Sequence, residues 1–528
     1  MNHPASATPA TSAPSRSDMI LFIASFLTLI AAGIGFSVRG GILGDWSRQF
    51  GFTQSELGTI TGGGLVGFGV TIIFFSFLAD RVGYRALMVI AFLFHLSSAV
   101  VTLLATPVFE SAGKEATYWC LYIGMFLFAL GNGTCEAVIN PLTATLFPRN
   151  KTHWLNILHA GWPAGLILGA VFGLLLQGTR WEVQMSIFLI PTLLYGILML
   201  GRPFPKSETT ASGVTMGTML LQFLSPILLL LVLLHAMVGY VELGTDSWIS
   251  NITGTILSSS SLGLALFIWT SFLMFALRFC AGPIVHQISP LGLLFVSAVL
   301  GATGLYLLGT ATTAIACFVA ATIYGLGKTF FWPTMLGVVS ERYPKGGALA
   351  LGIVGGVGML SAGALGGPGI GYKQDYYATG VLQAKSEYAA TYERYKASNA
   401  QTFLFFPPVA GLDGAKVGVL LDDGKKLKED IDILQRSGRQ LQDDKELARL
   451  AEWWYNVGEP HKAEDLEPIK EARLIGGQEA LKTTALVPVT MALGYLLLIV
   501  VFMLQGGYRQ IHIGETEHGG TDLPATPQ

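Results

Sequence analysis

A carboxylate and two amide side chains lie inside an apolar segment, where an ionised group is costly. Asn132, Glu136 and Asn140 recur at intervals of four within the stretch 118–147, which is long enough to cross a bilayer as a helix. Residues four apart share a helical face, so both amides are placed to donate to Glu136. A carboxylate at membrane depth faces protein or water and needs a partner. The pattern predicts a solute or proton site, or else a neutral Glu136 that caps a neighbouring helix.

Other apolar segments carry polar side chains at helical spacing. Asn156 and His159 lie three residues apart, and Tyr324, Lys328 and Trp332 follow at steps of four. Hydrogen-bond donors mixed with aromatic surface suit a polyhydroxy ligand. We therefore include all five among the candidate site residues, although a single buried histidine such as His159 is equally well explained as a satisfied core residue.

The two halves of the chain share a spacing that indicates an internal repeat. Glu136 lies five residues before Pro141, and Lys328 lies five residues before Pro333. In a parallel repeat, equivalent helices lie on opposite sides of a central site. The fourth and tenth apolar segments are therefore expected to face each other.

Charged residues in the first and seventh apolar segments correspond in the same way. Arg39 matches Glu242, and Asp246 follows Glu242 by one helical turn. We expect Glu136 with Lys328, and Arg39 with Glu242, to face a central cavity. Breaking a buried ion pair costs about 3–5 kcal/mol. Such pairs form either a conformation-dependent gate or a structural salt bridge, and spacing leaves open which residues touch.

The composition is that of a polytopic membrane protein. Of the 528 residues, 52% are hydrophobic and only 12% are charged, against about 25% charged in soluble domains. The 32 basic residues balance 34 acidic ones without a basic stripe, so we expect no nucleic-acid partner. The four cysteines lie in apolar segments, which indicates neither a disulfide framework nor a metal site. We expect no cofactor and no metal.

The hydropathy pattern predicts an all-α protein with twelve transmembrane helices in two pseudo-symmetric bundles of six. The predicted spans are 19–37, 54–77, 86–106, 118–147, 155–177, 183–203, 218–245, 256–278, 289–309, 313–338, 347–371 and 484–506. Basic residues gather in the loops after the second, fourth, sixth and tenth spans. This asymmetry predicts a multi-pass protein of the cell (inner) membrane with both termini in the cytoplasm.

These spans divide the chain into seven parts. They are a disordered tail at 1–18, a first bundle at 19–203, a linker at 204–217, helices seven to eleven at 218–372, a polar outer insertion at 373–482, helix twelve at 483–508 and a second tail at 509–528. The insertion carries no catalytic constellation. It is either a structural cap or a segment that captures solute or docks a partner.

The loop between the second and third predicted helices carries a motif. The stretch 76–85 reads SFLADRVGYR and contains Asp80, Arg81, Gly83 and Arg85. It resembles the inner-loop signature of the major facilitator superfamily, which implies a twelve-helix transporter. Asp80 would cap the neighbouring helix and pair with the basic loop in one conformation only, which biases an alternating-access equilibrium.

Three further stretches resemble the fucose permease branch of that superfamily, the fucose–galactose–proton symporters. They are 135–141 (CEAVINP), 154–160 (WLNILHA) and 240–249 (YVELGTDSWI). The resemblance implies that Glu136 takes part in sugar recognition and proton coupling. It also places an acidic residue where this chain has Gly40.

These observations predict a secondary transporter of a small polar solute, in the first place a monosaccharide carried by proton symport with alternating access. A buried carboxyl without a cation binds a proton near neutral pH. Because of Gly40, Glu242 or Asp246 would bind the proton, or the protein would be a uniporter. We expect no enzyme, since no nucleophile accompanies Glu136 and His159 and no Walker-type loop is present.

Two other functions stay open. Arg39 and Lys328 could bind a carboxylate or phosphate, which would make the chain a carrier or exporter of organic anions or metabolites. A membrane sensor that acts through the insertion is the alternative from a different class. In each case we expect a monomer in a lipid bilayer whose partner is a small-molecule solute.

Overall fold

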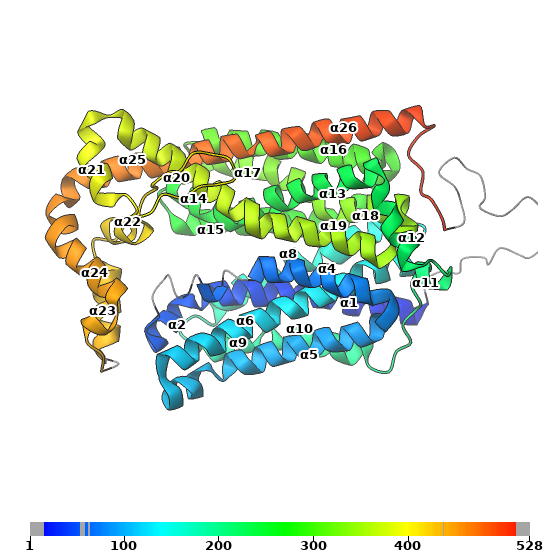
Figure 1. Ribbon diagram of the computed structural model, residues 1–528, viewed down its shortest axis with the longest axis horizontal. Coiled ribbons are helices and arrows are strands. Elements are labelled where there is room, and N and C mark those ends of the chain that lie inside the picture. The colour runs from blue at the N-terminus through cyan, green and yellow to red at the C-terminus, as the bar shows by residue number, and fades with distance from the viewer. Residues whose placement is uncertain (1–14, 53–56, 58, 62–63, 437, 514–528) are drawn as a thin grey trace, which may run out of the picture.

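The computed structural model describes residues 15–52, 57, 59–61, 64–436 and 438–513. Twelve helical segments in this part are long and apolar enough to cross a membrane, as the hydropathy pattern predicts. Figure 1 shows two adjacent bundles, with the insertion at one end and the start of α1 (Arg16–Gly41) and the finish of α26 (Leu486–Leu504) at the other. The two ends of the molecule are termed the insertion end and the terminal end.

The first bundle contains the first six spans. Its helices are α1, α2 (Leu43–Phe50), α4 (Gly64–Val82), α5 (Tyr84–Leu103), α6 (Ala105–Leu146), α7 (Lys151–His159), α8 (Gly161–Leu175), α9 (Trp181–Ser186) and α10 (Leu189–Met199). Within α6 the backbone kinks at Gly113, where φ is +79°, a conformation that glycine adopts without steric cost.

The linker and the second bundle follow. Their elements are α11 (Glu208–Ala211), α12 (Met216–Leu221), η1 (Gln222–Leu224), α13 (Pro226–Gly239), η2 (Tyr240–Gly244), α14 (Thr245–Ile256), α15 (Ser260–Arg278), α16 (Ala281–Thr310), α17 (Ala314–Lys328), α18 (Phe331–Arg342), η3 (Pro344–Gly346), α19 (Gly347–Ser361), η4 (Ala362–Gly366), α20 (Gly367–Ala384) and α26. Both η2 and η4 are π-helical turns, and they pack together so closely that a Cβ on Gly244 would lie 2.6 Å from the Cα of Gly366.

The insertion is a helical unit with its own apolar core. Its elements are η5 (Ser386–Tyr388), α21 (Ala389–Tyr395), α22 (Gly414–Leu421), α23 (Lys425–Arg436), η6 (Leu441–Asp443), α24 (Lys445–Trp453), η7 (Trp454–Gly458) and α25 (Glu459–Thr484). The expected limits 373 and 482 fall inside helices, because α20 continues the eleventh span and α25 leads directly into α26.

Where polar residues cap a helix, it begins or ends at a different residue from the span that hydropathy predicts. At the start of α1, Ser15 Oγ accepts from the backbone N–H of Asp18 (3.1 Å) and the Asp18 carboxylate accepts from Ser15 N–H (2.9 Å). This capping box satisfies backbone donors and starts the helix before the apolar run. Residues 1–14 and 514–528 of the predicted tails 1–18 and 509–528, and part of the predicted second span, lie outside the described residues.

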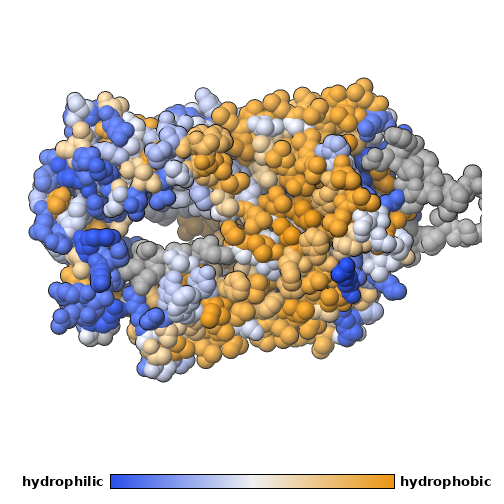
Figure 2. Space-filling model, viewed as in Figure 1, coloured by the Kyte–Doolittle hydropathy of each residue, from blue (hydrophilic) through white to orange (hydrophobic). Residues whose placement is uncertain are grey.

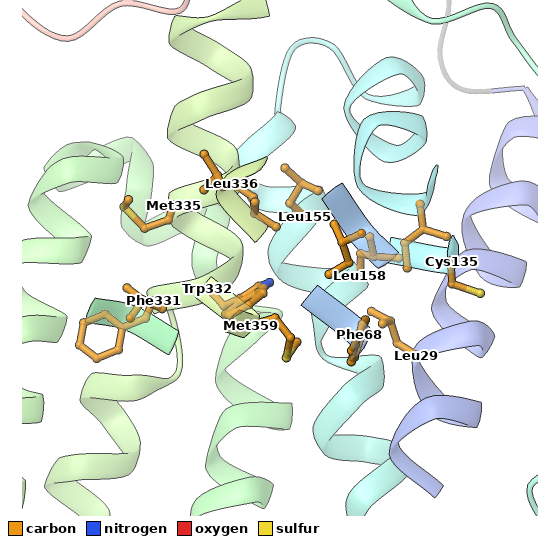
Figure 3. Packing of buried hydrophobic residues seen from close by; sticks show 14 of the residues in the cluster. Leu29, Phe68, Cys135, Leu155, Leu158, Phe331, Trp332, Met335, Leu336 and Met359 are labelled. Atoms are coloured by element: carbon orange, nitrogen blue, oxygen red, sulfur yellow. The ribbon is translucent and has the colours of Figure 1, made fainter. Parts of the chain in front are cut away.

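The two bundles meet through a packed apolar centre, surrounded by a hydrophobic band. Figure 2 shows this band between polar surface at the insertion end and at the terminal end. In Figure 3, Leu155 and Leu158 of α7 lie beside Trp332 and Leu336 of α18. All four are at most 5% exposed, so the bundles are in close contact at this level.

Hydrogen bonds close the molecule between this centre and the terminal end. Thr152 donates to Glu341 Oε1 through its N–H (3.2 Å) and its hydroxyl (2.6 Å), and Asn156 Nδ2 donates to Thr334 Oγ1 at 3.1 Å. At the insertion end, a cavity of about 800 Å³ lies between the insertion and Phe52 of the first bundle. The described structure is therefore closed at the terminal end and hollow at the insertion end.

Candidate functional site

Two buried ion pairs lie within the second bundle. Lys328 Nζ is 2.5 Å from Asp246 Oδ1, and Arg278 is 3.0 Å from Glu242 Oε1. The side chain of Lys328 is fully buried, whereas that of Asp246 is 13% exposed. A charge at this depth is stable only with a compensating partner, so the two carboxylates hold the two cations in place.

A proline creates the backbone acceptor that fixes Arg278 on the second bundle. The carbonyl of Thr329 would normally accept from the N–H four residues later, but that residue is Pro333, which has no N–H. Arg278 Nε donates to this freed carbonyl at 2.8 Å. The break between α17 and α18 therefore positions both Lys328, the last residue of α17, and the acceptor for Arg278.

A proline also leaves a backbone carbonyl without its helical donor on the first bundle. The carbonyl of His159 faces position 163, which is Pro163, and so lacks its helical partner. Arg278 donates to this carbonyl at 2.6 Å. One guanidinium thus joins two carbonyls freed by prolines, one in each bundle, and binds Glu242 with its remaining nitrogen.

A polar cluster on the first bundle contains three of the predicted site residues. Asn140 Nδ2 donates to Glu136 Oε2 at 2.6 Å, and Asn140 Oδ1 lies 2.9 Å from His159 Nε2. Glu136 is 6% exposed and none of the ion pairs in the described chain includes it. The predicted contact between Glu136 and an amide one turn later is present.

The placement expected for Asn132 is wrong. Its Oδ1 lies 3.0 Å from His95 Nε2, while His95 Nδ1 lies 2.9 Å from the hydroxyl of Tyr195. Each step of four residues rotates a helical face by about 40°, so Asn132 faces His95 of α5 while Asn140 faces His159 of α7.

The expectation that Arg39 faces a central cavity is also wrong. Its guanidinium donates to Ser98 Oγ at 2.8 Å and lies 3.9 Å from the centre of the Phe128 ring. A hydroxyl and an aromatic face within its own bundle thus hold the charge. The sequence left open which charged residues touch, and the structure pairs Glu242 with Arg278 and Lys328 with Asp246.

The remaining predicted residues make structural contacts around this centre. Asn156 joins the two bundles, as described above. The Tyr324 hydroxyl donates to the carbonyl of Val241 at 2.8 Å, and the Trp332 ring lies 4.5 Å from that of His235. Tyr324 and Trp332 therefore fix α17 and α18 against the seventh span.

The predicted loop motif contacts the linker between the bundles. Asp80 accepts from Ser207 Oγ (2.6 Å) and Thr209 Oγ1 (3.0 Å), so two hydroxyl groups of the linker hold its carboxylate in this conformation. Gly83 has a φ of +87°, and Arg81 and Arg85 are exposed. The motif ties the second span to the linker.

Sequence reasoning missed Arg278 as a site residue. It is the last residue of the apolar run 256–278, where a basic residue resembles an ordinary flank of a span. The signal that could have identified it is the pair of intramembrane prolines, Pro163 and Pro333, which leave carbonyls for a buried donor. Among the described residues, no three His, Cys, Asp or Glu side chains form a group that could hold a metal ion.

Three comparisons with known proteins complete the description. The family model "Major Facilitator Superfamily" matches residues 21–367. A "Cis,cis-muconate transport protein" of Acinetobacter baylyi is 26% identical over 192 residues, 36% of this chain and 44% of that protein. A "Gentisate transporter" of Corynebacterium glutamicum is 24% identical over 185 residues, 34% of this chain and 39% of that protein.

The chain thus spans less than half the length of either curated relative that it matches. Among solved structures, the E. coli fucose:proton symporter FucP superposes with a TM-score of 0.56 at 16% identity, covering 68% of this chain and 93% of that one. Identity at this level establishes a shared fold alone.

Proposed function

Because the chain belongs to the Major Facilitator Superfamily, whose members are membrane transporters, we propose that it carries a small organic carboxylate together with a proton. One observation carries the proposal: the fully buried Lys328 is paired with Asp246, whose carboxylate is partly exposed. A solute carboxylate that reaches this point has the same charge and geometry as the Asp246 side chain. It can therefore replace Asp246 as the partner of Lys328.

Charge balance couples this exchange to a proton. In the empty site Lys328 and Asp246 sum to zero, and a bound anion alone would leave a net negative charge in a medium of low dielectric, which is costly. A proton on Asp246 restores neutrality, so the loaded site again sums to zero. The anion and the proton are then favoured only together, which is the requirement for symport.

Arg278 has a different role in this proposal. It already donates to Glu242 and to two carbonyls on different bundles, so its release would leave three acceptors unsatisfied. Lys328 has one carboxylate partner and a Tyr324 ring at 5.3 Å. Lys328 is therefore the cation that binds solute, while Arg278 keeps the two bundles in register.

The curated relatives support the class of solute. The names of both denote transport of a carboxylate, muconate or gentisate. The matched segments cover about a third of this chain, so we take from them the carboxylate class and neither individual compound.

We further propose that the insertion end faces the outside of the cell membrane and the terminal end faces the cytoplasm. Basic residues cluster at the terminal end, where Arg81 and Arg85 flank the second and third spans and Lys345 follows the tenth, as expected for cytoplasmic loops. Solute would then approach from the insertion end and meet Asp246 before Lys328, since Asp246 is the partly exposed member of this ion pair.

Proton symport of a monosaccharide is the second candidate. It is favoured by the Glu136–Asn140–His159 cluster, because a carboxylate, an amide and an imidazole can together bind several hydroxyl groups. In that case Glu136, which has no ion-pair partner in the described chain, would be the proton-binding residue.

Uptake into proteoliposomes distinguishes the two candidates. Labelled muconate, gentisate and a panel of monosaccharides would be offered to wild type, Lys328→Met and Glu136→Gln, with and without an inward proton gradient. We expect the gradient to drive carboxylate uptake and Lys328→Met to lower it about tenfold or more, because a charged hydrogen bond contributes about 1.5–3 kcal/mol. Lys206→Met, an exposed linker lysine, is the matched control.

Monosaccharide uptake that Glu136→Gln abolishes and Lys328→Met preserves would overturn the carboxylate proposal in favour of the second candidate. Carboxylate uptake that ignores the proton gradient would retain the solute class and contradict the coupling.

A further inference from the structure

One loop of the insertion exposes large apolar side chains. In the loop 402–408, Leu404 is 64% exposed, Phe405 is 85% exposed and Phe406 is 43% exposed. The loop reads TFLFFPP and contains no charged residue. Contiguous apolar surface of this kind marks an interaction site rather than a water-facing loop.

We propose that the loop 402–408, termed the anchor loop, inserts into the lipid leaflet at the insertion end and ties the insertion to the bilayer. The partner is the boundary between the lipid headgroups and the acyl chains. The proposal does not depend on the solute that the protein carries.

The anchor loop has a defined conformation. Gln401 and Val409 exchange backbone hydrogen bonds of 2.8 and 2.9 Å at its base, and Phe406 N–H donates to the Phe403 carbonyl at 3.0 Å. Leu404 at its tip has a φ of +52°, which is unfavourable for a bulky side chain. The fold therefore maintains a strained turn that directs apolar side chains outward.

The base of the anchor loop lies at the edge of the hydrophobic band. Lys373 Nζ donates to Thr484 Oγ1 at 3.2 Å. Lys373 is the first charged residue after the apolar part of the eleventh span, and Thr484 is the last residue of α25, which leads into the twelfth. Beside it, the Tyr372 hydroxyl donates to the Pro407 carbonyl at 2.7 Å. Figure 2 shows the band giving way to polar surface where the insertion begins.

Contacts of the aromatic rings hold the loop against α20, on the side of the hydrophobic band. Tyr372 lies 6.0 Å from Phe403 and 5.9 Å from Phe406, measured between ring centres. Phe403 also reaches Gly369, one helical turn nearer the membrane centre, where a Cβ would lie 2.7 Å from the Phe403 ring. The loop is thus directed from the insertion back along α20 toward lipid depth.

The composition of the loop fits a lipid environment. Aromatic rings are favoured at the level of the headgroups, and Phe405 stacks on Phe406 with ring centres 4.7 Å apart. Pro407 and Pro408 have no backbone N–H, so two fewer donors need partners away from water. A charged protein partner would find no counter-charge in this loop.

The anchor also explains how the insertion is held over the cavity. On the side of the first bundle it is attached through Asp444, whose Oδ2 lies 3.7 Å from Lys114 Nζ. On the side of the second bundle it follows directly from the spans. Lipid contact at 402–408 would fix the insertion near the membrane if the ion pair between Lys114 and Asp444 opens during transport.

Spin labelling tests the proposal. Phe405→Cys would be labelled in full-length protein whose four native cysteines are replaced by serine or alanine, then reconstituted into phosphatidylcholine vesicles. The collision rates of the label with oxygen and with a water-soluble nickel complex report its depth. Leu497→Cys, in the exposed face of α26, and Glu429→Cys, exposed on α23, are the matched lipid and water controls.

We expect the oxygen-to-nickel ratio at position 405 to fall between those of the two controls. A ratio at 405 equal to that at 429 in vesicles would overturn the proposal. Low collision rates with both reagents would overturn it too, since they would show that the loop is covered by protein, either another chain or a second copy.

Discussion

Arg278 shows how single residues control the contact between the bundles. Two of its three acceptors are carbonyls that lack a helical partner because Pro163 and Pro333 follow four residues later. Without Arg278 these buried carbonyls would lose their donor, which is costly away from bulk water. The third acceptor, Glu242, would become an unpaired buried charge.

We predict that Arg278→Gln and Glu242→Gln each lower the free energy of unfolding by about 3–5 kcal/mol, and that the double variant loses clearly less than the sum. The reason is that each single change leaves the partner charge uncompensated, whereas the double change removes both. Thermal unfolding in detergent measures the effect, with the exposed Arg85→Gln as control. Additive losses would show that the two residues act independently.

At this scale the sequence predicts contacts within one helix better than contacts between helices. The Glu136–Asn140 contact follows from a spacing of four residues, and the structure contains it. Arg39 and Asn132 are buried polar residues of the type expected in a site, but their partners Ser98 and His95 come from α5. Spacing along one helix does not specify which neighbouring helix supplies a partner.

At the scale of elements, the contact between α4 and α19 depends on small residues. A Cβ on Gly352 of α19 would overlap the side chain of Ser76 on α4. At Gly355, three residues further along the same helix, a Cβ would meet nothing within 4 Å. The two glycines therefore form a matched pair for testing the interface between the bundles.

We predict that Gly352→Ala destabilises the protein by about 1–3 kcal/mol and slows transport, because overpacking forces the two helices apart. Gly355→Ala should be neutral or slightly stabilising, since alanine favours the helix over glycine. Melting temperature and initial uptake rate measure the two effects. Equal behaviour of the two variants would mean that α4 and α19 are not in contact here.

The α23 helix of the insertion contains a carboxyl that ionises with difficulty. Burial in the cavity wall, together with the carboxylates of Glu429, Asp422 and Asp444, raises the pKa of Asp430 to about 6, against the opposing effect of Lys426. A raised carboxyl pKa means that the folded state binds the proton more tightly than the unfolded state. Ionised Asp430 therefore destabilises α23 above about pH 6, and this cost disappears toward about pH 4.

We predict that Asp430→Asn slows amide hydrogen exchange in α23 at about pH 8 and has a smaller effect at about pH 5. Asp432→Asn, at an exposed position on the same helix, is the control and should have little effect at either pH. A stabilisation by Asp430→Asn that is as large at low pH as at high pH would contradict the shifted ionisation.

Hydropathy predicts the existence of elements but not their irregularities. All twelve spans are present, because a stretch of about 20 apolar residues has few alternatives to a helix in lipid. The π turns at 240–244 and 362–366 depend on the close approach of Gly244 to Gly366 from another span. No local pattern in either segment encodes that contact.

On the scale of the whole molecule, the repeat predicted two facing bundles and the structure contains them (Figure 1). The contacts of Thr152 and Asn156 with the second bundle close the terminal end, while the cavity under the insertion lies at the other. Transport by alternating access requires these contacts to break as the opposite end closes. The pairing of the buried charges within the second bundle was not predictable, because it depends on the relative rotation of the helices that carry them.

Proton uptake on solute binding shows whether anion and proton bind together at Lys328 and Asp246. Purified protein in weakly buffered detergent solution would be mixed with saturating gentisate, and a pH indicator would record protons taken up by wild type and Asp246→Asn. We expect uptake of about one proton per bound anion by wild type, because Asp246 is protonated when the solute replaces it at Lys328, and none by Asp246→Asn. Binding of gentisate without proton uptake, or equal uptake by both proteins, would contradict it.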